Sequence, residues 1–334
     1  MAARRKNRTR TIDIHAHYYP LPYLELIAAE GERFKATYRM TQDGFFFDTP
    51  GGSGARMATK FIDLDQRLAE MDRIGVDVHV LSLSQPMVYW ADADLSHRLA
   101  RAWNDGASAA HVKHPDRLLA FMTLPMLDRD RALDELRRAA RLPGMRGVYL
   151  GTNIEGRDLD DPIFEPIFAQ IAKLGLPVFL HPIQPTGGKR LQFFQMHNAL
   201  GFPFDTAIAA CHLIFGGVLD RHPGLQVNLP HAGGVLPILI GRIDHAYRVS
   251  GAAQHIAQPP SAYLKRFTYD TITHSKPILD WVISQVGISR IMLGSDYCFP
   301  MGTDRPVKIV DQLGLGDRQR ALILGGTAAK LLRL

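Results

Sequence analysis

Hydrophobic and polar positions follow two alternating patterns along this chain. Short runs rich in β-branched and aromatic residues predict strands, and longer stretches with apolar residues every three or four positions predict helices. The eight predicted strands are residues 11–15, 76–82, 118–122, 147–150, 178–180, 225–229, 267–271 and 290–293. The helical stretches between most of them are residues 64–74, 95–114, 131–141, 163–174, 206–219, 235–249 and 277–286.

Strand followed by helix, about eight times, is the pattern of an α/β protein with a (β/α)8 TIM barrel. The 334 residues leave room for insertions beyond a minimal barrel. Two insertions, residues 31–60 and 183–204, begin shortly after predicted strand ends, so we expect them over the C-terminal mouth. We expect residues 306–313 and 317–332 to form closing helices. No linker interrupts residues 11–334, which predicts a single domain.

Composition narrows the class of protein. Hydrophobic residues make up 46% and charged residues 22%, which excludes a disordered or collagen-like chain. No apolar run approaches the roughly 20 residues that cross a bilayer, so the sequence predicts no membrane partner. Cys211 and Cys298 are too few for a disulfide scaffold or a thiolate zinc site, and they fit a reducing cytoplasm.

The positive net charge is mostly an end effect. The chain carries +6, but its first ten residues contain five basic residues and no acidic one. The rest of the chain is therefore almost neutral, which argues against a nucleic-acid partner. We interpret residues 1–10 as a disordered basic tail, and no apolar segment follows it, which argues against a secretory signal.

Chemically reactive side chains gather at predicted strand ends. Residues two apart in a strand point to the same side, so His15 and His17 both face the barrel axis at the end of the first strand. The fifth strand ends at His181, the sixth reaches His231, and the eighth reaches Asp296. Residues on this face of a barrel carry chemistry, so this coincidence predicts a divalent-metal site.

These motifs resemble the amidohydrolase superfamily, which has HxH after strand one, His after strands five and six, and Asp after strand eight. Within it, the chain looks like the branch of α-amino-β-carboxymuconate-ε-semialdehyde decarboxylase and related aromatic-acid decarboxylases. The resemblance spans residues 11–334. It rests on Ile12-Asp13-Ile14-His15-Ala16-His17, Arg67-Leu68-Ala69-Glu70-Met71-Asp72, Leu180-His181-Pro182, His231-Ala232-Gly233-Gly234, Gly241-Arg242-Ile243-Asp244 and Leu293-Gly294-Ser295-Asp296-Tyr297.

The resemblance implies a role for each matching residue. His15, His17, His181 and Asp296 match the metal ligands, and Asp296 is also a candidate to orient a metal-bound water. His231 matches a general acid/base beside that water. Histidine suits this role because its ordinary pKa of about 6.5 permits proton donation and acceptance near neutral pH.

Substrate contacts are less strongly indicated. Arg56 resembles an arginine that binds a substrate carboxylate, with a surface position as the alternative. Arg242 matches an arginine that reaches the neighbouring subunit's site, which implies a homodimer. Phe193 and Phe194 are candidates to line a pocket for a planar substrate, with apolar packing as the alternative.

The predicted ligands favour one metal ion. Three imidazoles and one carboxylate suit Zn²⁺, with Mn²⁺ and Co²⁺ as alternatives. Binuclear relatives use a bridging carboxylate, commonly a modified lysine after the fourth strand. Residues 147–153 contain no Lys, Cys, Asp or Glu there. We expect no organic cofactor.

The sequence therefore predicts a metal-dependent, non-oxidative decarboxylase of a small unsaturated or aromatic carboxylic acid. In this hypothesis, His231 and a metal-bound water assist protonation and loss of CO₂. The alternatives are a lactone or amide hydrolase, or a hydratase, that uses the same water. A non-catalytic metal-binding barrel is a further alternative, and His231 argues against it.

Overall fold

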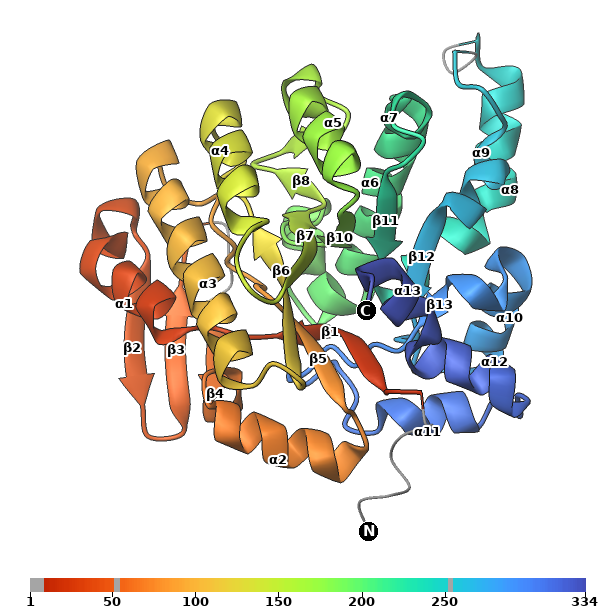
Figure 1. Cartoon of the computed structure of the whole chain (residues 1–334). Helices are drawn as coiled ribbons and strands as arrows, with labels where there is room; N and C mark the ends of the chain where they lie inside the picture. The colour runs from red at the N-terminus through yellow and green to blue at the C-terminus, as the bar shows by residue number, and fades with distance from the viewer. Residues whose placement is uncertain (1–8, 51–54, 252–254) are drawn as a thin grey trace.

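The computed structural model describes residues 9–50, 55–251 and 255–334 (Figure 1). Within these ranges, eight parallel strands form one sheet. Their order is β1 (Ile12–His17), β5 (Val78–Ser82), β6 (Leu118–Thr123), β7 (Met145–Gly151), β10 (Pro177–His181), β11 (Gln226–Leu229), β12 (Phe267–Asp270) and β13 (Ile291–Met292). The predicted basic tail, residues 1–10, lies almost wholly outside the described residues and stays a prediction.

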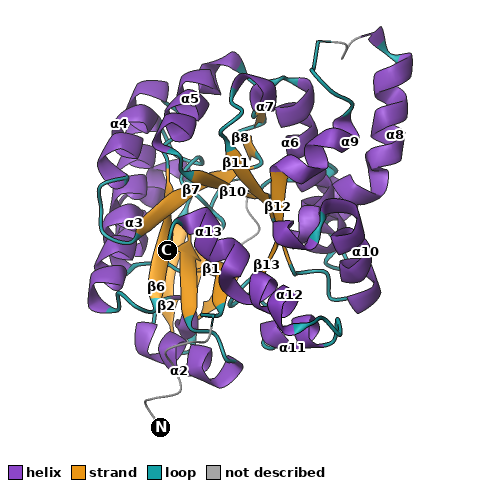
Figure 2. Ribbon diagram, turned by 45° about the vertical axis from the view of Figure 1, so that its right-hand side comes forward, coloured by secondary structure: helices purple, strands orange, loops and turns teal. Residues whose placement is uncertain are grey.

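The sheet closes into a barrel where the first and last strands meet. The backbone N–H of Ile14 donates to the Leu293 carbonyl at 2.9 Å, and that of His17 donates to the Tyr297 carbonyl at 2.6 Å. Helices surround the strands on the outside (Figure 2). The predicted (β/α)8 barrel is therefore confirmed, and each predicted strand overlaps an observed one.

Aspartate caps explain where several outer helices begin. The carboxylates of Asp63, Asp92 and Asp128 accept hydrogen bonds from backbone N–H groups in the first turns of α2, α3 and α4. The main barrel helices are α2 (Leu64–Ile74), α3 (Ala93–Lys113), α4 (Arg129–Ala139), α5 (Glu165–Leu174), α6 (Phe202–Phe215), α8 (Leu236–Val249) and α10 (Lys276–Val286).

One predicted helix is split in two. Residues 206–219 were expected to form one helix, but α6 ends at Phe215 and a short α7 (Val218–Arg221) follows. Gly217 between them has a φ of 70°, a left-handed conformation that ends a helix.

Aromatic side chains fill the barrel below the site. Phe179 lies 5.5 Å from Phe121 and 5.8 Å from Tyr149 between ring centroids, and all three are buried. The ring of His15 lies 5.0 Å from that of Phe179. The predicted metal ligands therefore rest on a packed apolar floor.

The two insertions contain structure that the sequence pattern did not indicate. Residues 31–60 hold a three-stranded antiparallel sheet of β2 (Thr37–Thr41), β3 (Gly44–Asp48) and β4 (Ala55–Ala58). A helix, α1 (Leu21–Glu30), precedes it. Residues 183–204 hold short helical turns, η4 (Gly188–Leu191) and η5 (His197–Gly201), before α6.

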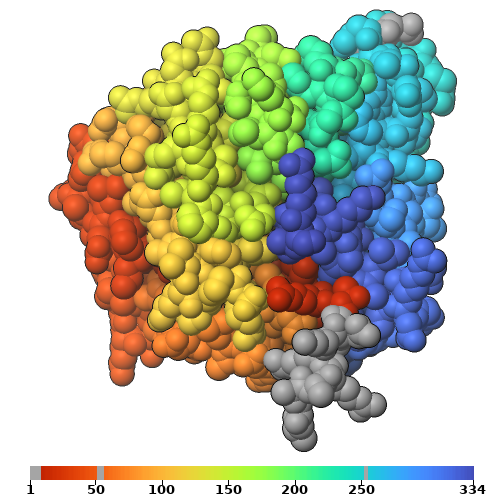
Figure 3. All heavy atoms as spheres, viewed as in Figure 1, coloured from red at the N-terminus to blue at the C-terminus, as the bar shows by residue number. Residues whose placement is uncertain are grey.

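The C-terminal segment packs against the start of β1. It consists of α11 (Pro306–Asp311), α12 (Asp317–Ala321), η10 (Leu322–Gly326) and α13 (Thr327–Leu332). Figure 3 shows this segment in dark blue against the red beginning of the described chain. The predicted closing helices are present, and α12, η10 and α13 form one uninterrupted helical run whose middle turn, η10, is π-helical.

One helical run, His197–Phe215, is long and apolar enough by composition to cross a membrane. Half of it is buried inside the protein, where α6 contacts α8 and the loop after β11. This burial is typical of a helix that packs in the core of a protein.

We predict that Gly325→Ala destabilises the barrel closure. A Cβ at this position would lie 1.9 Å from the Arg10 carbonyl oxygen, so the C-terminal segment has to shift away from β1. Overpacking of this kind typically costs about 1–3 kcal/mol. Thermal unfolding should show a lowered Tm. Gly326→Ala is the matched control, because its Cβ would meet no atom closer than 3.3 Å. Equal Tm values for the two variants would contradict the prediction.

Candidate metal centre

Four predicted side chains meet at the C-terminal end of the barrel. His15 and His17 come from β1, His181 ends β10, and Asp296 follows β13. One ligand atom from each lies within 4.8 Å of every other, and all four residues are buried. The register of three separate strands thus brings together residues that are up to 281 positions apart in the chain.

Each histidine is oriented through its Nδ1 atom. His15 Nδ1 lies 2.8 Å from Asp270 Oδ2, His17 Nδ1 lies 3.1 Å from Ser82 Oγ, and His181 Nδ1 lies 2.9 Å from the Pro182 carbonyl oxygen. A carboxylate and a carbonyl only accept hydrogen bonds, so Nδ1 of His15 and of His181 carries the proton. The Nε2 atoms of these two rings are then free to bind a metal.

The donor atoms fit a metal ion. Nε2 of His15 and Nε2 of His17 are 3.1 Å apart, and Asp296 Oδ1 lies 3.5 Å and 3.1 Å from them. Metal bonds of about 2.0–2.1 Å place tetrahedral neighbours about 3.3 Å apart. His181 Nε2 is buried without a hydrogen-bond partner among the described residues. Acceptor atoms gathered in a buried space favour a bound cation between them.

Desolvation of His15 is outweighed by its hydrogen bond to Asp270 and by the charge of Asp296, which raise its pKa, whereas burial keeps the other two imidazoles neutral. Burial lowers the pKa of His17 to about 4 and that of His181 well below its ordinary value. A protonated ring could not bind a metal, so neutrality at pH 7 favours coordination.

Asp270 is a site residue that the sequence analysis missed. Its Oδ2 holds His15 Nδ1, while its Oδ1 accepts from the backbone N–H of Ala232 at 2.9 Å and of Ile272 at 3.1 Å. One buried carboxylate thus positions both a metal-facing ring and the loop that carries His231. The sequence did contain a signal for Asp270, because it ends β12 and the ends of the neighbouring strands already carried candidate residues.

His231 stands beside the four-residue cluster. Its ring centroid lies 5.4 Å from that of His15 and 5.7 Å from that of His181. Burial lowers its pKa, and its Nδ1 has no hydrogen-bond partner among the described residues. A Cβ on Gly234 would lie 2.1 Å from the Pro203 carbonyl oxygen, so this loop needs glycine to pack against α6.

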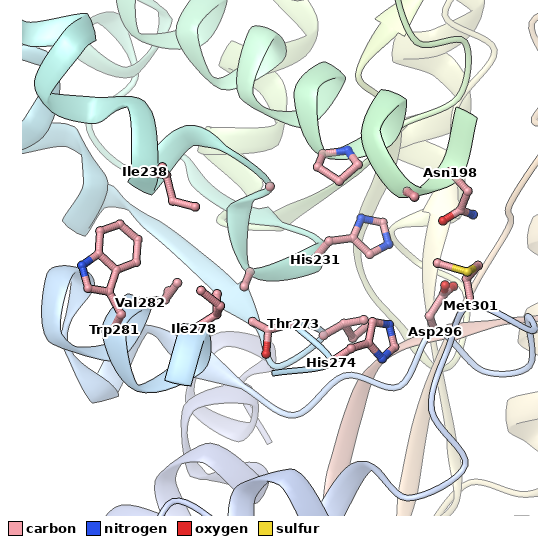
Figure 4. Close-up of a pocket in the computed structure, with 15 residues that line it drawn as sticks. Asn198, His231, Ile238, Thr273, His274, Ile278, Trp281, Val282, Asp296 and Met301 are labelled. Atoms are coloured by element: carbon pink, nitrogen blue, oxygen red, sulfur yellow. The ribbon is translucent and has the colours of Figure 1, made fainter. Parts of the chain in front are cut away.

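Two cavities open at His231 and Asp296, which line both. The smaller, of about 150 Å³, has polar walls that include Ser84, Gln85 and Asn198. The larger, of about 220 Å³, has an apolar end. Figure 4 shows His231 in the larger cavity, with Asn198, Asp296 and Met301 on one side and Ile238, Ile278, Trp281 and Val282 on the other.

The predicted substrate contacts are not gathered at these cavities. Arg56 is exposed on β4, and Arg242 is exposed on α8. Phe193 and Phe194 are 67% and 92% exposed. None of the four lines either cavity, whereas Phe202 and Phe299 line the smaller one. Phe202 lies in the same insertion as Phe193 and Phe194, so sequence position alone did not indicate which of the three lines the cavity.

Comparison with known proteins gives consistent matches. A protein family described as Amidohydrolase matches residues 12–334. A 2-amino-3-carboxymuconate-6-semialdehyde decarboxylase of Dictyostelium discoideum is 31% identical, and the alignment covers 98% of this chain and 92% of that protein. A gamma-resorcylate decarboxylase of Rhizobium sp. is 30% identical over 75% of this chain and 81% of its own length. The crystal structure of 5-carboxyvanillate decarboxylase from Sphingomonas paucimobilis superposes with a TM-score of 0.85, at 27% identity, over 98% of this chain and 99% of that one.

We predict that Asp270→Asn weakens metal binding. The asparagine oxygen would serve the two backbone N–H groups, which turns its NH₂ toward His15 and forces the proton of that ring onto Nε2. The loss of such a carboxylate typically costs about 10- to 100-fold in metal affinity. Competition with a chromogenic chelator measures the metal affinity. Asp205→Asn, at another buried carboxylate, is the matched control and should bind metal as the wild type does. Unchanged affinity in Asp270→Asn would refute the assigned orientation of His15.

Proposed function

The chain belongs to the amidohydrolase family, and on that basis we propose that it is a metal-dependent, non-oxidative decarboxylase of a small aromatic or unsaturated carboxylic acid. The observation that carries this proposal is the buried cluster of three histidines and one aspartate with His231 beside it. The relatives named above, all decarboxylases, support it.

The site suits one divalent metal ion, which His15, His17, His181 and Asp296 would hold. Three neutral imidazoles and one carboxylate favour Zn²⁺ as our first choice, with Mn²⁺ and Co²⁺ as alternatives. When bound, the ion supplies a Lewis acid that polarises an oxygen of the substrate. No organic cofactor enters the proposed reaction.

His231 would move the proton. Its imidazolium form donates a proton to the ring carbon that carries the leaving carboxylate. The bond between that carbon and the carboxylate then breaks, its electron pair restores the unsaturated system, and CO₂ leaves. Because burial lowers the pKa of His231, its protonated form is a stronger acid than an exposed histidine would be. The His231 imidazole regains a proton from solvent before the next turnover.

The rest of the substrate would lie in the two cavities beside His231. Polar groups such as Gln85 and Asn198 suit hydroxyl or carboxylate substituents. Arg56 stays our candidate for a substrate carboxylate, as an unpaired guanidinium among the described residues. Phe193 and Phe194 stay candidates for contact with a planar substrate because they directly precede residues that line the smaller cavity.

We further propose a homodimer in which Arg242 acts in the neighbouring site. Ile238, Arg242, His245 and Val249 form an exposed stripe on α8. Ile238 also lines the apolar end of the larger cavity, where Ile278 and Trp281 are exposed too. A second copy seated on this stripe would cover the apolar end and bring its own arginine to it. The two unpaired cysteines support a reducing, cytoplasmic location.

We predict that removal of metal abolishes turnover. Chelator-treated protein should release no CO₂ from hydroxybenzoates or muconate-type acids, and Zn²⁺, Mn²⁺ or Co²⁺ should restore release. Gas evolution and the mass of the product report the reaction. A new acid without CO₂ would identify the hydrolase alternative. Full activity in metal-free protein would rule out the proposed chemistry.

We predict that His231→Gln keeps the metal and loses turnover by about 10²- to 10⁴-fold, as expected for a general acid/base. Metal analysis and CO₂ release measure the two properties separately. His212→Gln serves as control, because that ring pairs with Asp160 and lines neither cavity. Turnover of His231→Gln at the wild-type rate would remove His231 from the mechanism.

We predict that two inactive variants complement each other. Arg242→Ala and His231→Gln subunits, mixed and allowed to exchange, should regain up to about a quarter of wild-type activity, since half of the two-fold symmetric dimers then hold one complete site. Native mass spectrometry verifies that mixed dimers form. If they form and stay inactive, Arg242 does not act across the interface.

A further inference from the structure

A charged side chain is buried where the barrel closes. Arg67 on α2 is 0% exposed. Its Nη2 donates a hydrogen bond to the backbone carbonyl of His17, and its guanidinium lies over the Tyr297 ring at 4.7 Å from the centroid. No carboxylate of the described residues lies within 4.0 Å of it. Arg67 thus contacts both β1 and the segment that carries Asp296.

A second path leads from Arg67 to the same two segments. Arg67 Nη1 lies 3.2 Å from His79 Nδ1. Arginine only donates hydrogen bonds, so His79 Nδ1 accepts and its proton sits on Nε2. That Nε2 has no hydrogen-bond partner among the described residues, and the nearest carboxylate oxygen, Asp13 Oδ2, lies 3.5 Å away. The His79 ring therefore lies between the guanidinium and a carboxylate on β1, hydrogen-bonded to the first and in electrostatic contact with the second.

Asp13 joins the two strands directly. Its Oδ1 accepts from the backbone N–H of His15 at 3.0 Å and from that of Ser295 at 3.1 Å, while the Ser295 hydroxyl donates to Oδ2. His15 and the neighbour of Asp296 are thereby tied to one buried carboxylate. Arg67, His79 and Asp13, which we call the seam network, link the histidine-bearing strand to the aspartate-bearing segment.

We propose that Arg67 is a positioning residue that sets the spacing between His15 and His17 on one side and Asp296 on the other. Here β1 meets the chain beyond β13 through only a few backbone hydrogen bonds and the isolated bridge between Ala16 and Tyr297. The seam is therefore a part of the barrel at which the two groups of donor atoms would separate if it opened. The inference rests on the metal site of the proposed function.

Metal affinity tests this role separately from catalysis. Arg67→Met removes every donor but fills most of the volume. We expect the dissociation constant for Zn²⁺, measured against a competing chelator, to rise about tenfold. This is the lower end of the range seen when a group that orients metal ligands is removed. The visible absorption spectrum of the Co²⁺-loaded variant should shift, since it reports ligand geometry. Arg67→Lys, which can still donate to the His17 carbonyl, should recover part of the affinity.

Met71→Ala is the matched structural control. Met71 is also fully buried on α2, one helical turn from Arg67, and takes no part in the seam network. It should lower Tm without changing the Zn²⁺ affinity or the Co²⁺ spectrum. If Arg67→Met does not fold, Ser295→Ala removes the hydroxyl that donates to Asp13 of the seam network and should raise the dissociation constant several-fold.

The outcomes separate the two proposals. Weakened metal binding in Arg67→Met and Ser295→Ala, with intact binding in Met71→Ala, supports the inference. Wild-type affinity in Arg67→Met, or in Ser295→Ala where it alone folds, overturns it. So does equal weakening by Met71→Ala. Wild-type protein that binds no Zn²⁺ overturns the proposed function itself.

Discussion

Three imidazole nitrogens and one carboxylate oxygen face one another in a buried space at the end of this barrel. His15 Nε2 and His17 Nε2 lie 3.5 Å and 3.1 Å from Asp296 Oδ1 there. The fold brings these atoms together from β1, the end of β10 and the segment after β13, where a bound metal ion would make their proximity favourable.

The surrounding residues make sense as supports for that arrangement. Asp270 orients His15 and the His231 loop through one carboxylate, so metal and proton donor share a common anchor. Arg67 and Asp13 contact β1 and the segment around Asp296 at the closing seam of the barrel. Rigid support of this kind is what a site needs when its geometry has to be present before the substrate arrives.

Much of this could be predicted from the sequence, because barrel strands place chemistry at their ends. His15 and His17 follow from a period of two, and His181 and Asp296 follow from strand termini. Asp270 also ends a strand and could have been named as a candidate, but its role and that of Arg67 could not be found in this way. Their roles depend on contacts with residues 255 and 50 positions away, which no local pattern encodes. The antiparallel sheet of the first insertion was missed because its strands lie in a stretch without clear period-two alternation. Exposure of Phe193 and Phe194 was equally invisible, since aromatic composition does not reveal which way a loop turns.

The most direct measurement is diffraction from crystals grown with Zn²⁺, with data collected on both sides of the zinc absorption edge. The account predicts a single anomalous peak bonded to Nε2 of His15, His17 and His181 and to Asp296. A peak at another place, or no peak between these four side chains in crystals grown with excess Zn²⁺, would contradict the account.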